Sequence, residues 1–207
     1  FDSSLILENR LAGVMGGKMA VGGLRAGAEP FIEQLAAPTA TPGGGSASAA
    51  AGAMAAALGI MVAGMSRGKK AYAQYEQQLS LAMARLGQLK EDLKAGIDAD
   101  AASYTQVMSA YKQAKESANG DAMIESALKT ATRVPLETAQ HAREVATLVE
   151  SLRPISNPNM ASDLTVAQAL AHAAVQGALA NVEINLTSLK DQSFVADTRS
   201  RAAQLQR

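Results

Sequence analysis

The chain has no cysteine, no tryptophan and only two histidines among its 207 residues. Without cysteine it can form no disulfide framework, no thiolate metal site and no cysteine nucleophile. The two histidines, His141 and His172, lie far apart in the sequence, and neither has a partner at a metal-ligand spacing. We therefore interpret both as structural residues and expect no metal site.

An excess of charge of either sign is also missing. Lysine and arginine together number 19, as do aspartate and glutamate, so the formal net charge is zero. This balance gives no global attraction to nucleic acid or to an anionic membrane, and any charged ligand must be held by a local site. The chain also lacks GxSxG, HExxH and Walker patterns, which argues against a hydrolase triad, zinc proteolysis and nucleotide hydrolysis.

One apolar run, residues 47–65, is long enough to cross a bilayer. It consists mainly of Ala, Gly and Met, with few Leu, Ile or Val residues. Because small residues gain little from lipid and let helices approach closely, the run predicts a central buried helix and no membrane span. The absence of cysteine makes the cytoplasm the expected compartment. The chain begins at Phe1 without a basic segment or cleavage site, which predicts a fragment or trimmed protein with no signal peptide.

The sequence predicts an N-terminal arm or interdomain linker over residues 1–23 and one helical domain over residues 24–207. Pro30 suits the first turn of the first helix of this domain, and Pro135 predicts a kink inside a later one. Helices are expected at about residues 29–37, 47–65, 71–115, 121–152 and 164–189, followed by a polar helical tail.

No segment combines period-two alternation with β-branched enrichment, so no strand is expected. The predicted fold class is all-α, a helical bundle with long, kinked, Ala-rich helices. Aromatic residues make up only 3% of the chain, which leaves each copy short of bulky core side chains. Burial against a second copy would supply the rest, so we expect the bundle to be dimeric.

The most informative motif is a glycine loop, Pro42, Gly43, Gly44, Gly45 and Ser46, directly before the Ala-rich helix. Its glycines expose backbone N–H groups without a Cβ in the way. Ser46 can cap the helix, whose positive end favours an anion or a polar ring edge. The loop therefore has two interpretations of about equal weight, a ligand loop and a flexible connector.

Asp98, Asp100 and Tyr104 form a polar group in the long helix. Asp100 and Tyr104 are four residues apart and share a face, where they could do acid–base chemistry. They lie beside a stripe that is predicted to be buried and consists of Leu93, Ile97, Ala101 and Met108. A solvated helix face that carries ordinary acids would explain the same residues.

A second polar group precedes the helix at residues 164–189. It consists of Asn157, Asn159, Ser162 and Asp163. Capping chemistry explains these residues well, but four hydrogen-bonding side chains exceed what one cap needs. Asn181, Glu183 and Asn185 add further polar groups at helical spacing. Amide and carboxylate groups of this kind suit a heteroaromatic ring with several donors and acceptors.

These motifs form an ordered series along the chain. The series is Thr41-Pro42-Gly43-Gly44-Gly45-Ser46, Asp98-Ala99-Asp100-Ala101 with Tyr104, Val134-Pro135-Leu136, Asn157-Pro158-Asn159 with Ser162-Asp163-Leu164, and Asn181-Val182-Glu183-Ile184-Asn185-Leu186. Over about residues 28–190, its order and spacing resemble the cyclodeaminase/cyclohydrolase family. That family includes the cyclodeaminase part of formiminotransferase-cyclodeaminase and its stand-alone bacterial relatives.

The resemblance implies an all-helical homodimer that binds a tetrahydrofolate derivative near the glycine loop. It implies closure of 5-formiminotetrahydrofolate to 5,10-methenyltetrahydrofolate with release of ammonia. The alternative is hydrolysis of methenyltetrahydrofolate to 10-formyltetrahydrofolate. Neither reaction requires a bound metal or redox cofactor, and an upstream formiminotransferase domain is a further expected partner. A non-enzymatic helical scaffold is the competing class, because fold alone does not exclude it.

Within this resemblance, we assign acid–base work to Asp100 and Asp163, with Asp98 and Tyr104 in reserve. The residues expected to orient the pterin and aminobenzoyl parts of the folate are those of the glycine loop with Asn157, Asn159 and Ser162. The residues expected to meet its glutamate tail are Arg67, Lys69 and Lys70.

Overall fold

The computed structural model describes residues 23–206. The chain divides into two compact units, residues 1–39 and residues 40–207. The first unit contains helix α2 (Gly23–Ala36), and the second contains the other helices. Except for Gly23, the predicted arm over residues 1–23 lies outside the described residues, so its boundary with the domain stays a prediction.

Helix α2 begins earlier than the sequence pattern predicts. It runs from Gly23 and contains Pro30 in its interior, so the placement of Pro30 in the first turn is wrong. The residues before Pro30 include good helix formers, and Arg25 forms an i,i+4 ion pair with Glu29 at 3.6 Å. These local preferences extend the helix on the N-terminal side of the proline.

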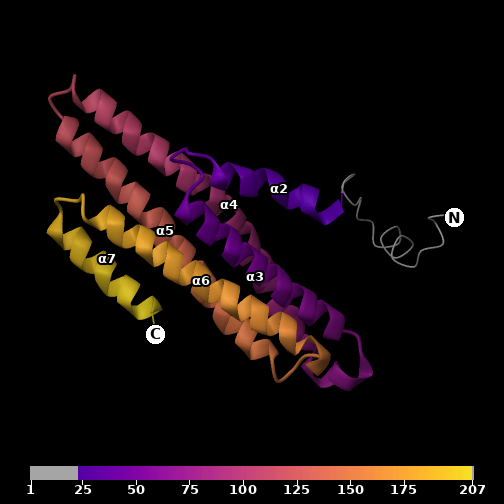
Figure 1. Ribbon diagram of the computed structural model, residues 1–207. Coiled ribbons are helices and arrows are strands. Elements are labelled where there is room, and N and C mark those ends of the chain that lie inside the picture. Colours follow the sequence, from indigo (N-terminus) through magenta and orange to yellow (C-terminus); the bar gives the residue numbers. More distant parts are fainter. Residues whose placement is uncertain (1–22, 207) are drawn as a thin grey trace. The chain divides into compact units, whose positions relative to one another are not determined.

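The second unit is an antiparallel bundle of α3 (Gly44–Ser66), α4 (Glu76–Ala114), α5 (Gly120–Leu152) and α6 (Ala161–Leu186). Each helix packs against the next along the chain, and α3 also packs against α6, which closes the ring (Figure 1). The 3₁₀ turns η2 (Lys70–Tyr75) and η3 (Pro158–Met160) lie in two of the connections. Residues 23–206 contain no strand, and the predicted all-α bundle is confirmed.

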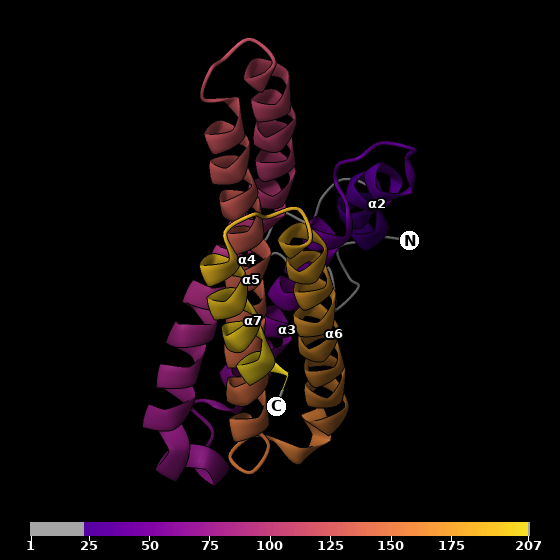
Figure 2. The same ribbon diagram turned by 90° about the vertical axis from the view of Figure 1, so that its left-hand side faces the viewer.

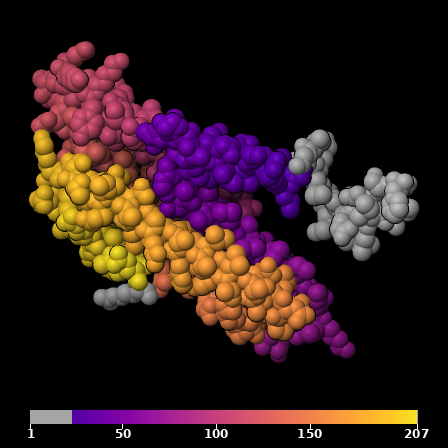
Figure 3. Space-filling view, viewed as in Figure 1, coloured from indigo at the N-terminus to yellow at the C-terminus, as the bar shows by residue number. Residues whose placement is uncertain are grey.

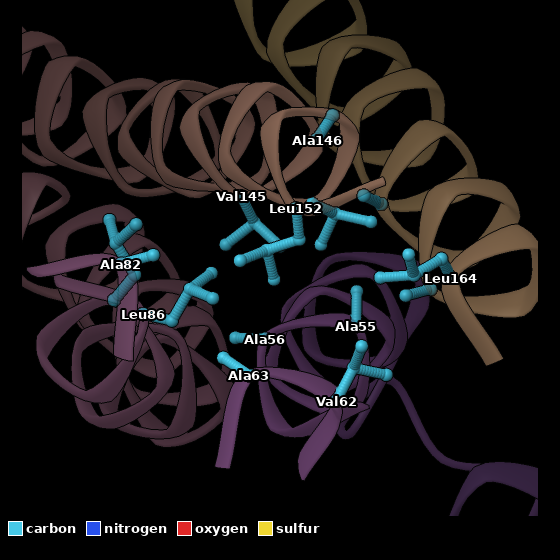
Figure 4. Close-up of a cluster of buried hydrophobic side chains, with 14 of the residues drawn as sticks. Ala55, Ala56, Val62, Ala63, Ala82, Leu86, Val145, Ala146, Leu152 and Leu164 are labelled. Carbon is cyan, nitrogen blue, oxygen red and sulfur yellow. The ribbon is translucent and has the colours of Figure 1, made fainter. Parts of the chain in front are cut away.

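The bundle core is built from small and medium apolar side chains. Ala56 and Ala63 of α3 are fully buried and lie next to Leu86 of α4, whereas Ala55 lies on the side of Leu164 of α6 (Figure 4). Alanine fills little space between two helices, so close packing of such a core requires the helices to approach each other closely.

Three glycines of α3, spaced seven residues apart, form its closest contacts with α4. A Cβ at Gly52 would lie 3.0 Å from Leu93 Cδ2, and one at Gly59 would lie 2.9 Å from another leucine methyl group of α4. A Cβ at Gly45 would overlap the carboxylate of Asp100. Residues seven apart share a helix face, so α4 lies directly against a glycine row on the α3 backbone.

Helices α4 and α5 are longer than their partners, with 39 and 33 residues against 23 in α3 and 26 in α6. Their linked ends project as a two-helix hairpin beyond α3 and α6 (Figure 2). Helix α7 (Gln192–Leu205) packs beside α5 and α6 over a second apolar cluster that includes Leu136, Val182 and Val195. Asp191 caps α7 and accepts a hydrogen bond from Lys129 of α5 at 2.7 Å.

Among the described residues, α3 is the one helix long and apolar enough to cross a membrane, with a mean hydropathy of 1.7 over its scored window. It packs against α4, α5 and α6, and half of that window is buried inside the bundle. The helix is therefore a central element of the bundle, as the small residues predict, but its outer face stays exposed.

Pro135 lies inside α5, which continues without a break from Gly120 to Leu152. Proline has no N–H group, so the carbonyl of Ala131, four residues earlier, loses its intrahelical donor. Asn185 of α6 replaces that donor, because its Nδ2 donates to Ala131 O at 2.9 Å. A polar residue of α6 thus satisfies a backbone group that the proline leaves free.

We expect Asn185→Ala to lower the free energy of unfolding by about 1–3 kcal/mol, because it leaves the buried Ala131 carbonyl unsatisfied. The loss should shrink in a Pro135→Ala background, where the restored N–H of residue 135 can donate to that carbonyl. Urea denaturation of the two single variants and the double variant measures this coupling. An equal cost of Asn185→Ala in both backgrounds would contradict the assignment.

Candidate active site

Helix α3 begins at Gly44, and Gly43 is its N-cap residue, with φ −129° and ψ −156°. Gly43 has no side chain that can satisfy the first amides of the helix. Ser46 lies inside the first turn, so the prediction that Ser46 caps this helix is wrong. Gly44 and Gly45 belong to the helix itself, which argues against a flexible connector at these two positions, and the ligand-loop interpretation stays a prediction.

Asp100 of α4 takes the place of the missing cap. Its Oδ2 accepts a hydrogen bond from Ser46 N at 2.9 Å. The buried Ser46 hydroxyl lies 3.0 Å from the same oxygen and 2.9 Å from Ile97 O, and can donate to either. A helix N-terminus leaves its first N–H groups without intrahelical acceptors and favours negative charge. The half-buried Asp100 carboxylate is therefore fixed in orientation at the start of α3.

Helix α6 contributes the side-chain amide of Asn181 to the start of α3. A Cβ at Gly44 would lie 3.3 Å from Asn181 Nδ2, which itself donates to Gly177 O at 2.8 Å. Ser48 Oγ donates to Gly44 O at 2.7 Å, and a Cβ at Gly177 would overlap that hydroxyl. The start of α3 is thus enclosed by a carboxylate from α4 and an amide from α6. We call this arrangement of Gly44, Gly45, Ser46, Asp100 and Asn181 the helix-start cluster.

An exposed strip of large side chains continues from Asp100 along α4. Tyr104, Met108 and Tyr111 are 43%, 51% and 44% exposed, and their spacing places them on one helix face. The predicted burial of Met108 is wrong, because α4 continues past the first residue of α3. Tyr111 was not among the residues singled out from the sequence. Its spacing of seven residues from Tyr104 could have indicated that the two tyrosines share a helix face.

Asp98 is exposed and two residues from Asp100, which places it on a different side of α4. Pro42 precedes the N-cap residue and is half-buried. The helix-start cluster therefore contains Asp100 but excludes Asp98 within one chain.

The other predicted site residues lie where α3 ends and α6 begins. They are Arg67, Lys69, Lys70, Asn157, Asn159, Ser162 and Asp163. Asn157 N donates to Ser66 Oγ at 3.0 Å, and the Asn157 side chain accepts from Asn159 N at 3.1 Å, which caps η3. Asp163 is half-buried in the first turn of α6, and Ser162 is exposed.

Arg67 is held by Glu76. Its Nε donates to Glu76 Oε1 at 2.9 Å, and Gly68 N donates to Glu76 Oε2 at 2.9 Å. The Gly68 amide, followed by the Arg67 guanidinium, holds the pKa of Glu76 below its usual value. Lys69 and Lys70 are exposed and form no ion pair with any residue in the described part of the chain, so they remain available to an anionic ligand.

The two groups of predicted residues are far apart within one chain. Asn181 in the helix-start cluster and Asp163 at the other group lie 18 residues apart on α6. At 1.5 Å per residue, this spacing corresponds to about 27 Å. The two assigned acid–base carboxylates, Asp100 and Asp163, therefore do not meet in a single protomer.

Two of the polar residues noted near Asn181 have structural partners. Arg199 of α7 donates to Glu183 at 2.6 and 3.2 Å, and this hydrogen-bonded pairing lowers the pKa of Glu183. Asn185 donates a hydrogen bond to the Ala131 carbonyl, as described above. Both residues therefore support the bundle, and their helical spacing alone does not indicate a ligand site.

A cavity of about 710 Å³ lies between α5, α6 and α7, and its lining includes Arg143, His172 and Leu179. Its lining includes Glu183 but none of the residues assigned to catalysis or to folate binding. Within residues 23–206, no group of three His, Asp or Glu side chains gathers as metal ligands.

Known proteins resemble this chain over most of its length. Residues 27–204 match the family described as Formiminotransferase-cyclodeaminase. The chain is 39% identical to the methenyltetrahydrofolate cyclohydrolase of Methylorubrum extorquens, over 82% of this chain and 83% of that protein. The solved formiminotetrahydrofolate cyclodeaminase of Thermotoga maritima matches with a TM-score of 0.79 and 31% identity, over 86% of each chain.

Longer relatives match as well. The chain is 33% identical to the formimidoyltransferase-cyclodeaminase of Gallus gallus over 84% of its own length. It spans only 33% of that protein. The similarity to the longer proteins therefore concerns one part of each.

We expect Gly45→Ala to lower the free energy of unfolding by about 1–3 kcal/mol, because the added methyl group would overlap the Asp100 carboxylate. Gly87→Ala is the matched control, since no atom lies within 4 Å of a Cβ at that helical position. It should raise stability by about 0.5–1 kcal/mol through lower chain entropy. Urea denaturation checks both values, and equal effects of the two substitutions would contradict the close contact.

Proposed function

The chain belongs to the formiminotransferase-cyclodeaminase family, and we propose that it closes 5-formiminotetrahydrofolate to 5,10-methenyltetrahydrofolate with release of ammonia. Its relatives are named as folate one-carbon enzymes, and the chain is an enzyme of this class. The observation that carries the proposal is the helix-start cluster, in which Asp100 is fixed against the first turn of α3.

Ring closure forms a bond between folate N10 and the formimino carbon and then breaks the bond from that carbon to the departing nitrogen. Through the tetrahedral intermediate, N10 loses a proton and the departing nitrogen gains one, so that ammonia leaves. Asp100 is the proposed acceptor of the N10 proton, because both hydrogen bonds found to its carboxylate among the described residues go to Oδ2. Its Oδ1 lies against Gly45 and accepts no hydrogen bond from the described residues, so it is the oxygen proposed to take the proton.

The same cluster provides groups that orient a folate. The first amides of α3 and the Asn181 side chain suit the polar edge of a pterin. The exposed strip of Tyr104, Met108 and Tyr111 offers an aromatic and apolar surface for its flat ring. Because N10 and the formimino carbon belong to one molecule, holding the reactive conformer supplies much of the acceleration.

Methenyltetrahydrofolate hydrolysis is a second candidate reaction. The 39% identity to the Methylorubrum extorquens cyclohydrolase, over 83% of that protein, favours it. Water then adds to the methenyl carbon, and the bond from that carbon to N5 breaks to give 10-formyltetrahydrofolate. Asp100 would accept a proton from the attacking water in this reaction.

The remaining assignments extend the proposal. Asp163 would act as the second acid–base group, with Asp98 and Tyr104 in reserve. Asn157, Asn159 and Ser162 would orient the folate, and Lys69 and Lys70, with Arg67, would meet its glutamate tail. We further propose a cytoplasmic homodimer without a bound metal or cofactor, and a formiminotransferase domain as a partner upstream, as in the Gallus gallus relative.

Asp100→Asn should lower kcat for methenyltetrahydrofolate formation by about 100-fold or more, since it removes the proton acceptor but keeps the side-chain shape. Ultraviolet absorbance of methenyltetrahydrofolate follows its formation from 5-formiminotetrahydrofolate and its loss by hydrolysis, which separates the two reactions. Asp92→Asn, at an exposed position on the same helix, is the matched control and should retain activity.

Circular dichroism must first show that both variants are folded. Wild-type turnover of neither substrate would reject the proposed function. Full activity of a folded Asp100→Asn variant would reject the role of Asp100 while leaving the reaction in place.

A further inference from the structure

The cavity between α5, α6 and α7 lies where α7 ends, and side chains of all three helices line it. Arg143 belongs to α5, His172 belongs to α6, and Leu205 is the last residue of α7. Figure 3 shows α7 (yellow) at the molecular surface beside α6 (orange). The volume of about 710 Å³ falls within the roughly 300–1,000 Å³ that is typical of small-molecule sites. The cavity is therefore large enough for a ligand.

The cavity and the helix-start cluster lie on different sides of α6. Glu183 lines the cavity, whereas Asn181, two residues earlier, lies against Gly44 of α3. Two residues of an α-helix correspond to a rotation of about 200°, so these two side chains leave α6 on nearly opposite sides. A ligand in the cavity would therefore bind apart from the residues proposed for catalysis.

Arg143 brings to the cavity a positive charge that is not used inside the chain. It is half-buried and forms no ion pair with any residue between 23 and 206. The adjacent Glu144 is bound instead by Arg85, whose Nε and a terminal nitrogen each donate to it at 2.6 Å. Glu183, also in the lining, is paired with Arg199 at 2.6 Å. The charge of Arg143 is thus left for a ligand, and a guanidinium group favours a carboxylate.

His172 adds a second polar group to the lining. Its Nε2 lies 3.3 Å from Nε2 of Gln168, one helical turn earlier on α6, which positions the ring. The other ring nitrogen, Nδ1, has no hydrogen-bond partner in the part of the chain that the structure describes. An imidazole nitrogen that carries a proton donates to a carboxylate, so His172 suits the same ligand group as Arg143.

The rest of the cavity has an apolar wall. Val175 and Leu179 of α6 are only 5% and 6% exposed, and the half-buried Leu205 reaches the cavity from α7. Val175 and Leu179 follow His172 by three and seven residues, which corresponds to about 4.5 Å and about 10 Å along α6. A ligand whose polar end meets His172 would therefore lay about 10 Å of apolar chain along this wall.

We propose that this cavity binds a small monocarboxylate with an apolar body, of the size of a medium-chain fatty acid. Its carboxylate is bound by Arg143 and His172, and its chain lies along Val175 and Leu179. One carboxylate matches the one unpaired cation of the lining. Because Arg199 already pairs with Glu183, no cation is left at that end of the cavity for a second acid group. This site goes beyond the proposed folate reaction and does not depend on it.

Octanoate is the probe for this site, and octan-1-ol, which has the same chain length but no charge, is its control. In a chain with isotopically labelled Val and Leu methyl groups, octanoate should shift the NMR signals of Val175, Leu179 and Leu205. Titration calorimetry should give an affinity for octanoate about tenfold or more above that for octan-1-ol, because a hydrogen bond to a charged group is lost in the alcohol. Equal affinities, or no shift at these three residues, would overturn the proposal.

Removal of the cation tests the role of Arg143. Arg143→Gln should lower the affinity for octanoate about tenfold and leave the affinity for octan-1-ol unchanged. Arg153→Gln is the matched control, because Arg153 directly follows α5 and does not line the cavity. Circular dichroism reports whether both variants are folded. Undiminished octanoate binding by a folded Arg143→Gln variant would contradict the proposal.

A bulky side chain in the cavity provides a second test that leaves its charges in place. Ala180 is exposed and lines the cavity, whereas Ala173 is exposed on the same helix and does not line it. Ala180→Trp should abolish binding of octanoate and of octan-1-ol, and Ala173→Trp should retain both. Octanoate binding that survives in a folded Ala180→Trp variant would place the ligand elsewhere.

Competition with a folate separates this proposal from the proposed function. Saturating 5-formyltetrahydrofolate should leave octanoate bound, because the cavity contains none of the residues assigned to folate. Displacement of octanoate by this folate would make the cavity part of the folate site and would overturn the proposal. Octanoate binding by a chain that turns over neither folate substrate would reject the proposed function and retain the carboxylate site.

Discussion

The approach of α4 to the backbone of α3 is the contact on which the rest of the structure depends. Gly52 and Gly59 leave room for leucine side chains of α4, and Gly45, in the same row, leaves room for the Asp100 carboxylate. A single seven-residue repeat therefore sets both the helix packing and the position of the carboxylate proposed for catalysis. A side chain at any of these three glycine positions would push α4 away from α3 and would thereby also displace Asp100.

Polar side chains in this Ala-rich bundle often satisfy backbone groups of another helix. Asp100 caps the first turn of α3, and Asn185 donates to the carbonyl that Pro135 leaves without a donor. Such cross-helix bonds are worth more than surface contacts, because an unpaired buried polar group costs the full desolvation penalty. They also fix the orientation of Asp100, as the proposed acid–base chemistry requires.

The two faces of α3 have different roles. Its inner face packs against three helices, whereas its outer face exposes three methionines and no charge. The inner face therefore holds the bundle together, whereas the outer face is left in part to solvent within one chain, and the homodimer stays a prediction from the sequence.

The sequence by itself determined the helices, their order and the all-α bundle, because periodicity, proline and glycine act locally. It also singled out Asp100 as a candidate, through residue types at helical spacing. Only the tertiary structure decided that Asp100 caps α3 in place of Ser46, that Glu183 and Asn185 serve the bundle, and that Met108 is exposed. Each of these depends on which helix lies opposite and how far it extends, and such long-range contacts leave no periodic signal in one sequence.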